Sequence, residues 1–182
     1  MKKLLLILLA LLVIKANAQI YKSTESMVSF FSETPLENIN ATNKASVSVL
    51  NINTGEIVFK VPIASFSFKD ATMQEHFNEN YMESDKYPSA VLDMAIVENI
   101  DLTKDGAYDI TLHGTVDMHG TKQARDIKGK LIIKNGVPVQ ATAAFDVKLA
   151  DHGIKIPKAV TMNIAEIIKV DVDFALEKYQ KK

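Results

Sequence analysis

The sequence has no cysteine and no tryptophan among its 182 residues, and it contains only 7 glycines and 5 prolines. Without cysteine the chain forms no disulfide, has no thiol nucleophile and lacks the lipid-modified cysteine of a lipoprotein. A large charge of one sign is also missing, because the net charge is −1. A chain this weakly charged is not expected to bind nucleic acid through the phosphate backbone.

Long apolar runs are missing except at the N-terminus. Lys2 and Lys3 precede the apolar run Leu4–Ile14, and Ala16-Asn17-Ala18 follows it. This order is typical of a cleavable secretory signal, with cleavage before Gln19. The run is shorter than the roughly 20 residues that cross a bilayer, although an uncleaved anchor is the alternative. We therefore expect residues 1–18 to be a signal peptide and 19–182 to be one domain, periplasmic or secreted, with no stable membrane anchor.

The dominant sequence period after residue 19 is two, which indicates β-strands rather than helices. Between Tyr108 and Met118, for example, apolar side chains alternate with polar ones such as Asp109, Thr111 and His113. Pro62 lacks an amide donor and belongs at a strand end, an edge or a bulge. Eight strands are predicted, at 26–33, 37–51, 56–68, 90–100, 107–118, 125–134, 137–149 and 160–176. Such long strands favour an all-β, antiparallel, eight-stranded barrel.

Two local signals complete the predicted architecture. Asn135-Gly136 lies between two alternating segments and predicts a tight hairpin. Residues 71–81 do not alternate; instead Met73, Phe77 and Tyr81 recur every four residues, as on one face of a helix. Thr72 and Glu75 would form a capping box at its start. One short helix in a β chain suits a barrel mouth.

A barrel of eight strands either fills its interior with side chains or encloses one small ligand. Small residues on the predicted inner face favour a cavity, and they are Ala45, Gly114, Gly129, Ala141 and Ala143. A plain packed core in which these residues fit the taper is the alternative. Because the inner face has almost no polar group, an enclosed ligand would be apolar, with any head group near the mouth.

The residues expected to line this cavity come from four strands and the helix. They are Phe59, Val61, Met73, Phe77, Tyr81, Ile110, Leu112, Ala141, Ala143, Phe145, Val170 and Val172. His76 and Lys122 are candidates for contact with a ligand head group, since both are basic residues near the predicted mouth. Ordinary exposed side chains are the alternative for these two positions.

No constellation of residues points to catalysis or to a bound metal. His113, Asp117 and His119 share one strand face, but strand residues four apart are separated by roughly 13 Å, too far for one ion. The sequence has no Gly-x-Ser-x-Gly motif, and Asp171 and Asp173 form a charged stripe on an outer face. We expect a protein that is not an enzyme and uses no metal or other cofactor.

Three segments together resemble the YceI-like family. They are His76-Phe77-Asn78-Glu79-Asn80-Tyr81 with Ser84-Asp85-Lys86-Tyr87-Pro88, then Gly114-Thr115-Val116-Asp117-Met118-His119-Gly120-Thr121-Lys122, then Asp151-His152-Gly153-Ile154. Their order and spacing agree with the family over nearly the whole chain after residue 19. The sequence departs from the family pattern at Asp117, usually threonine, and at His152, usually an aromatic residue.

The resemblance implies a lipocalin-like barrel that binds a polyisoprenoid or another amphiphilic lipid without catalysis. We therefore expect an exported protein that holds an isoprenoid-like or fatty amphiphile for transport, storage or sequestration. The alternative is a structural or interaction protein with a solid barrel that binds a partner through its outer surface. A homodimer is compatible with either function.

Overall fold

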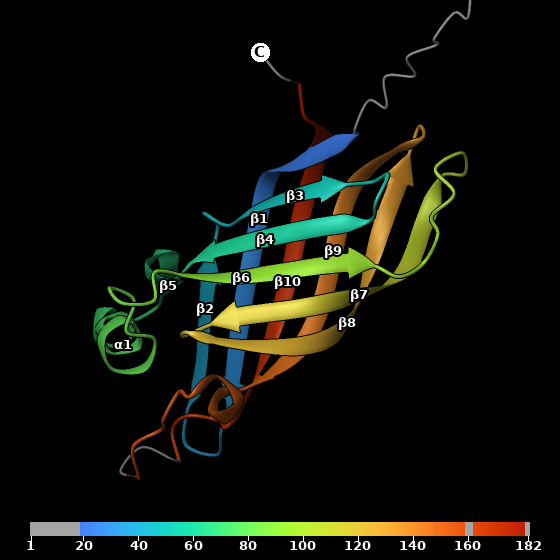
Figure 1. The fold of residues 1–182 in the computed structure, drawn as a ribbon. Helices are drawn as coiled ribbons and strands as arrows, with labels where there is room; N and C mark the ends of the chain where they lie inside the picture. Colours follow the sequence, from blue (N-terminus) through green and yellow to red (C-terminus); the bar gives the residue numbers. More distant parts are fainter. Residues whose placement is uncertain (1–18, 159–161, 181–182) are drawn as a thin grey trace, which may run out of the picture.

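Eight strands form a closed antiparallel ring in the computed structural model, which describes residues 19–158 and 162–180 (Figure 1). They are β1 (Ile20–Glu33), β3 (Val47–Asn51), β4 (Glu56–Pro62), β6 (Ser89–Ile96), β7 (Gly106–Met118), β8 (Thr121–Lys134), β9 (Val137–Lys148) and β10 (Ile167–Lys178). Pairing of β10 with β1 closes the ring. The predicted eight-stranded antiparallel barrel is confirmed. The predicted signal peptide at 1–18 lies outside the described residues.

Two of the predicted strands are broken in the structure. The segment expected as 37–51 forms β2 (Asn38–Asn43) and β3, and the segment expected as 56–68 forms β4, the 3₁₀ turn η1 (Ile63–Ser65) and β5 (Phe66–Phe68). β2 and β5 pair with each other, and β2 also pairs with β1, so the ring is extended at one end. Pro62 ends β4, as expected for a residue without an amide donor.

Asn43 connects the two breaks. Its side chain is fully buried; Nδ2 donates to the Pro62 carbonyl at 2.7 Å, while Oδ1 accepts from Ala45 N at 2.9 Å and from Ser46 Oγ at 3.0 Å. These bonds satisfy backbone groups that the interrupted ladder leaves unpaired. The amide side chain of Asn43 therefore stabilises both breaks.

Other strand ends also differ from the predicted ones. β1 begins at Ile20, because its first residues pair with both β3 and β10. β8 begins at Thr121, directly after the β7 turn, and β10 begins at Ile167 rather than at residue 160. The connection before β10 is held against β1, where Ala165 N donates to Ser32 Oγ at 2.9 Å.

The turns follow their residue types. Asn135 and Gly136 have φ values of 53° and 74°, the left-handed conformation of the predicted hairpin turn. His119 and Gly120 form a similar turn between β7 and β8, with φ values of 53° and 71°. Gly114 has another function, since a Cβ there would lie 2.1 Å from the Asp93 carbonyl oxygen. This glycine permits close approach of β6 and does not leave interior space.

The predicted helix has two parts. α1 (Ala71–His76) continues into the π-helical turn η2 (Phe77–Tyr81), in which Met82 N donates to the Phe77 carbonyl. The predicted capping box was wrong: Asp70, not Thr72, accepts a hydrogen bond from Met73 N at 3.0 Å. Asp70 has an extended backbone suited to the N-cap position. None of the described helices is long and apolar enough to span a membrane.

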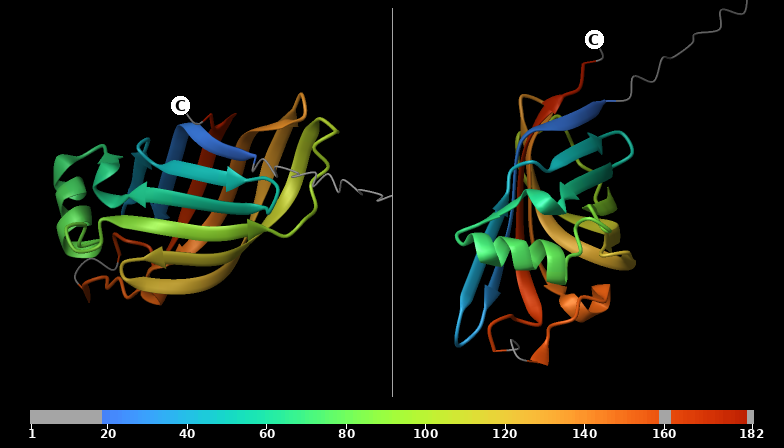
Figure 2. Two further views of the ribbon diagram at one scale, coloured as in Figure 1. Left: turned by 45° about the horizontal axis from the view of Figure 1, so that its top comes forward. Right: turned by 90° about the vertical axis from the view of Figure 1, so that its left-hand side faces the viewer.

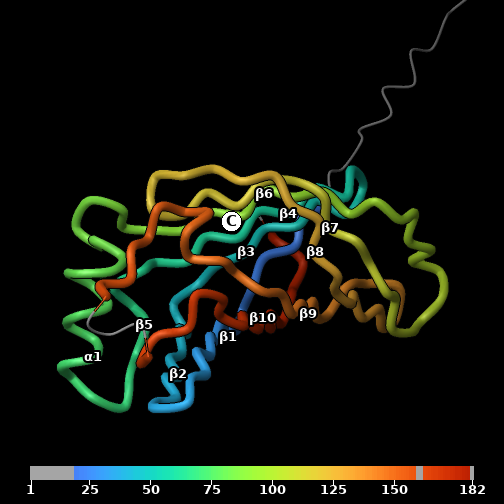
Figure 3. The backbone as a smooth tube through the Cα atoms, turned by 90° about the horizontal axis from the view of Figure 1, so that it is seen from below, coloured from blue at the N-terminus to red at the C-terminus, as the bar shows by residue number. Residues whose placement is uncertain are grey.

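The interior has a packed end and an end near the helix. The right panel of Figure 2 shows α1 lying across one end of the barrel, and Figure 3 shows the segment after β9 running beside it. Most of the largest fully buried apolar side chains come from the strand ends opposite α1, and they are Tyr21, Leu50, Ile57, Leu131 and Ile133. Close packing at this end stabilises the barrel, so the end near α1 does not need to be filled with side chains.

Candidate ligand cavity

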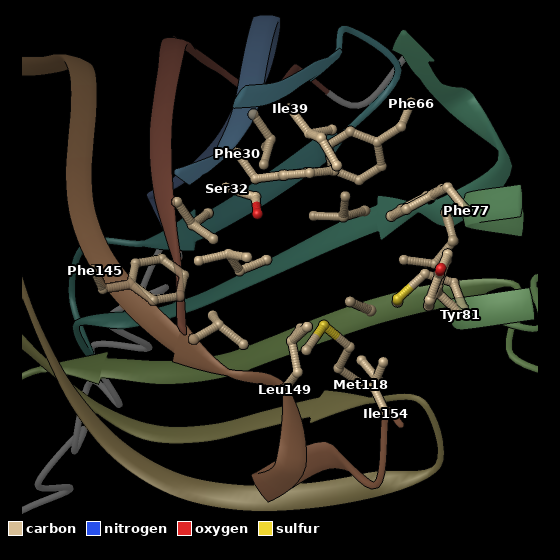
Figure 4. Close-up of a pocket in the computed structure, with 18 of the residues that line it drawn as sticks. Phe30, Ser32, Ile39, Phe66, Phe77, Tyr81, Met118, Phe145, Leu149 and Ile154 are labelled. Atoms are coloured by element: carbon tan, nitrogen blue, oxygen red, sulfur yellow. The ribbon is translucent and has the colours of Figure 1, made fainter. Parts of the chain in front are cut away.

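A cavity of about 340 Å³ occupies the barrel at the end that α1 covers (Figure 4). It is more than twice as large as a cavity of about 150 Å³ that takes up benzene in another protein. Inward side chains of the strands form its wall because alternate residues of a strand point to the same face. Among the lining residues are Val28, Ile39, Ile63, Ala90, Leu92, Val116, Ile127, Val147 and Ile168.

Aromatic side chains hold the helix against the barrel. Phe77 of η2 stacks on Phe30 of β1 with ring centroids 5.5 Å apart, and it contacts Phe66 and Phe68 of the β5 strand at 5.6 and 5.0 Å. Tilted and edge-on ring pairs of this kind add to the free energy gained by apolar burial. All four rings line the cavity, so the contacts that fix the helix also form the cavity wall.

The floor of the cavity is formed by Phe59, Leu112, Ala143 and Val172, which also line the space beyond it. Phe174 packs on Phe59, with ring centroids 4.9 Å apart. Beyond the floor is a space of only about 10 Å³, close to the lower limit for one water molecule. Ile110 and Ala141 line this small space and not the main cavity. The prediction that these two residues line the cavity was wrong, because they lie on the packed side of the floor.

Polar atoms are few in the cavity wall. Ser32, Glu37, His76, Tyr81 and Asn163 are the lining residues with a hydrogen-bonding side chain among the described parts of the chain. Burial raises the pKa of Tyr81 above that of an ordinary tyrosine, so its hydroxyl stays protonated and can donate. A wall of this composition suits an apolar ligand body with a small polar end.

Comparison with known proteins identifies the fold and the family. Residues 20–176 match the YceI-like domain. The chain belongs to the YceI-like family. A search of curated proteins finds no match.

Solved structures of YceI-like proteins share the barrel. A polyisoprenoid binding domain from Saccharophagus degradans, implicated in plant cell wall breakdown, is 14% identical with a TM-score of 0.69, over 87% of this chain and 98% of that one. BcnA of Burkholderia cenocepacia is 13% identical with a TM-score of 0.67, over 84% and 96%. A YceI protein of Campylobacter jejuni is 12% identical with a TM-score of 0.55, over 78% and 85%. At these identities the likeness shows the fold alone.

Most of the residues predicted for the site of this YceI-like protein lie around the cavity. Ten of the twelve apolar positions line it: Phe59, Val61, Met73, Phe77, Tyr81, Leu112, Ala143, Phe145, Val170 and Val172. His76 also lines it, from α1. Lys122 does not, because it alternates with the inward-facing positions of β8 and its side chain is exposed. Their contact with a ligand stays a prediction.

Sequence reasoning missed several lining residues and misplaced a small one. Phe30, Phe66 and Met118 line the cavity, and Figure 4 shows them around it. Alternation in β7 already placed Met118 on an inner face, whereas Phe30 had no such signal, because Met27 and Phe31 put apolar side chains on the other face of β1 as well. Ala45, expected inside, is exposed because it lies in the break between β2 and β3. Gly129 is inward, but a Cβ there would lie 2.6 Å from the Thr142 carbonyl oxygen.

The three family-like segments meet at His119 in the β7–β8 turn. Its Nε2 lies 3.0 Å from Glu83 Oε2, its Nδ1 lies 3.1 Å from the His152 carbonyl oxygen, and its ring is 4.5 Å from that of Tyr87. Both partner atoms are acceptors, so both bonds form together only when both ring nitrogens carry a proton. His119 therefore joins the segment after η2 to the 3₁₀ turn η3 (Leu149–His152) and supports one side of the cavity.

Two histidines each contact a single carboxylate, and none of the described histidines belongs to a larger cluster of possible metal ligands. His113 is exposed and its Nδ1 lies 2.6 Å from Asp126 Oδ1 on the neighbouring strand. His152 is fully buried, with Nδ1 3.3 Å from the Thr121 carbonyl oxygen. Within the described residues no three histidine, aspartate or glutamate side chains lie close enough to hold a metal ion. The contacts of these histidines are therefore structural ones within the barrel.

Proposed function

We propose that this protein binds an isoprenoid-like or fatty amphiphile in the cavity under α1. The observation that carries the proposal is a cavity of about 340 Å³ whose wall is apolar apart from a few side chains. An apolar chain gains roughly 25 cal/mol for each Å² of surface that it removes from water. The S. degradans domain of the same fold, described as polyisoprenoid binding, supports the same class of ligand.

The proposed function is binding without catalysis. Ser32 is a buried hydroxyl in the cavity wall, but its hydrogen-bond partner within the described residues is the backbone N–H of Ala165 and not a histidine. A serine nucleophile needs an adjacent base within hydrogen-bond reach. The alternative is a solid barrel that acts through its outer surface. The end of the barrel beyond Phe59 is packed as that alternative requires, but the end under α1 is hollow.

We place this binding outside the cytoplasm, in the periplasm or after secretion. The support is the order of basic residues, apolar run and Ala16-Asn17-Ala18 at the start of the sequence. A lipid outside the cytoplasm must cross water between membranes or between cells. A barrel that encloses the apolar chain would carry, store or sequester it there.

The test is native mass spectrometry of the full-length chain expressed in bacteria and recovered from the exported fraction. We expect the mass of a chain that begins at Gln19, together with a bound lipid that organic extraction releases. Protein stripped of lipid should then take up one equivalent of farnesol. A protein that is consistently empty and takes up neither farnesol nor a fatty acid would contradict the binding function.

A further inference from the structure

Three of the five polar residues of the cavity wall, Ser32, Glu37 and Asn163, lie at or against the turn between β1 and β2. Ser32 and Glu37 flank this turn, and both line the cavity. The loop before β10 contacts both of them: Asn163 Nδ2 donates to Glu37 Oε2 at 3.1 Å, and Ala165 N donates to Ser32 Oγ at 2.9 Å. Asn163 and Ala165 are two residues apart, so one short loop segment holds both of these cavity-lining side chains.

Glu37 is held in place by its own turn. Thr34 N and Oγ1 donate to the Glu37 carbonyl at 3.1 and 2.8 Å, and Glu37 N donates to Thr34 Oγ1 at 3.1 Å. Asn163 occupies Oε2, whereas Oε1 has no hydrogen-bond partner within residues 19–158 and 162–180. The half-buried carboxylate therefore has an acceptor atom left to bind a donor.

Ser32 supplies the complementary group. Its side chain is 2% exposed, and Figure 4 shows its oxygen directed into the cavity. Its oxygen accepts the Ala165 N–H, while its own proton has no acceptor among the described residues. A hydroxyl can donate as well as accept, so Ser32 can donate to a ligand oxygen. The pair thus offers one donor and one acceptor.

The charges around the cavity discriminate against anions. Within the described ranges no lysine or arginine lines the cavity, and Glu37 is the acidic residue in its wall. His76 is the remaining ionisable base, and it is exposed on α1. An anionic head group next to Glu37 would meet a like charge in surroundings that screen it poorly. It would also accept only, and so could not satisfy the Glu37 oxygen.

We propose that Ser32, Glu37 and Asn163 form a head-group subsite for an uncharged hydroxyl, so that the cavity selects lipid alcohols over lipid carboxylates and phosphates. The alcohol oxygen accepts from Ser32 Oγ, and its proton is donated to Glu37 Oε1. This assignment rests on the proposed lipid-binding function and names the chemical class of its ligand. It differs from the predicted contacts of the head group with His76 and Lys122: Lys122 is exposed on β8, and His76 lines the cavity from α1 rather than from the β1–β2 turn.

The test compares three ligands that differ only in the head group: farnesol, farnesoic acid and farnesyl phosphate. Their affinities are measured at pH 7.5 by displacement of the uncharged probe N-phenyl-1-naphthylamine. We expect farnesol to bind roughly tenfold more tightly than either anion, because of the unpaired like charge. Ser32→Ala should weaken farnesol about threefold to tenfold, the size of one hydrogen bond.

The decisive variant is Glu37→Gln, which keeps the shape and an acceptor for Asn163 while removing the charge. It should bring the two anions to within about threefold of farnesol, since the repulsion is gone. Glu177→Gln is the matched control, because Glu177 pairs with Lys22 at the opposite end of the barrel. Urea unfolding of each variant verifies that the barrel is folded.

The outcomes separate this proposal from the one on which it rests. If the three ligands bind equally, or if Glu37→Gln leaves the preference unchanged, the head-group assignment is wrong and lipid binding stands. If farnesoic acid binds best and His76→Gln abolishes that preference, the head group lies at α1 instead. If none of the three ligands displaces the probe, both proposals fail.

Discussion

Asn43 is the polar residue on which the kinked side of the barrel depends most. Its fully buried amide joins the break after β2 to the break after β4 through Pro62, Ala45 and Ser46. Asn43→Ala removes the side-chain partner of the Pro62 carbonyl, of the Ala45 N–H and of the buried Ser46 hydroxyl. We expect it to lower the free energy of unfolding by about 3 kcal/mol, measured by urea denaturation.

The matched control is Asn40→Ala on the same strand, since Asn40 is exposed. This variant should change the free energy of unfolding by less than about 0.5 kcal/mol. Equal effects of the two substitutions would show that Asn43 does not hold the breaks together.

His119 is the second residue whose contacts reach far along the chain. We expect a double-mutant cycle of His119→Asn and Glu83→Gln to give a coupling energy of about 0.5–1 kcal/mol, because the Glu83 side chain is 45% exposed. Asparagine tolerates the left-handed backbone of the turn, so the cycle reports the lost contact and not new strain. Additive effects in urea unfolding would contradict a direct bond.

At the scale of elements, α1 depends on the N-cap residue that precedes it. Asp70 accepts from Met73 N, and its replacement by alanine removes the N-cap. We expect Asp70→Ala to cost about 1 kcal/mol and to speed hydrogen exchange at the Met73 amide. Thr72→Ala, at the position that the sequence pattern favoured, should change neither. Faster hydrogen exchange in Thr72→Ala but not in Asp70→Ala would contradict the Asp70 N-cap and support the predicted capping box.

The sequence predicted the strands well and their interruptions poorly. Alternation along β7 and β9 predicted how far these strands extend, and Asn135-Gly136 predicted the turn between β8 and β9. The breaks in the segments 37–51 and 56–68 follow from Asn43, whose side chain reaches Pro62 at 2.7 Å. A contact between residues 19 apart in sequence has no local periodic signal. The same applies to the loop before β10, which is held by Ser32.

The whole barrel is packed at one end and hollow at the other. A packed core and an open cavity were alternatives in the sequence analysis, whereas the structure has both, separated by the floor residues that line both spaces. Inward alternation placed ten of the twelve predicted cavity residues correctly around the hollow end. It could not place Ile110 and Ala141, because alternation gives the face of a strand and not the depth along the barrel. Glu37 was missed because it was expected to begin the strand 37–51, whereas it lies in the turn before β2.

Ala143 provides the most direct test of ligand binding in the hollow end. It lines the cavity on β9, between Gly129 and Val172, whereas the next residue, Ala144, is exposed on the outer face. Phenylalanine at 143 would extend into cavity space at some cost in stability, and phenylalanine at 144 would leave the interior unchanged.

The measurement is farnesol uptake by wild type, Ala143→Phe and Ala144→Phe, with urea unfolding to verify that all three are folded. We predict that Ala143→Phe loses uptake at least roughly tenfold, because a buried ring displaces the ligand chain, while Ala144→Phe binds as wild type does. Unchanged uptake by a folded Ala143→Phe would contradict the proposal that the ligand lies in this cavity.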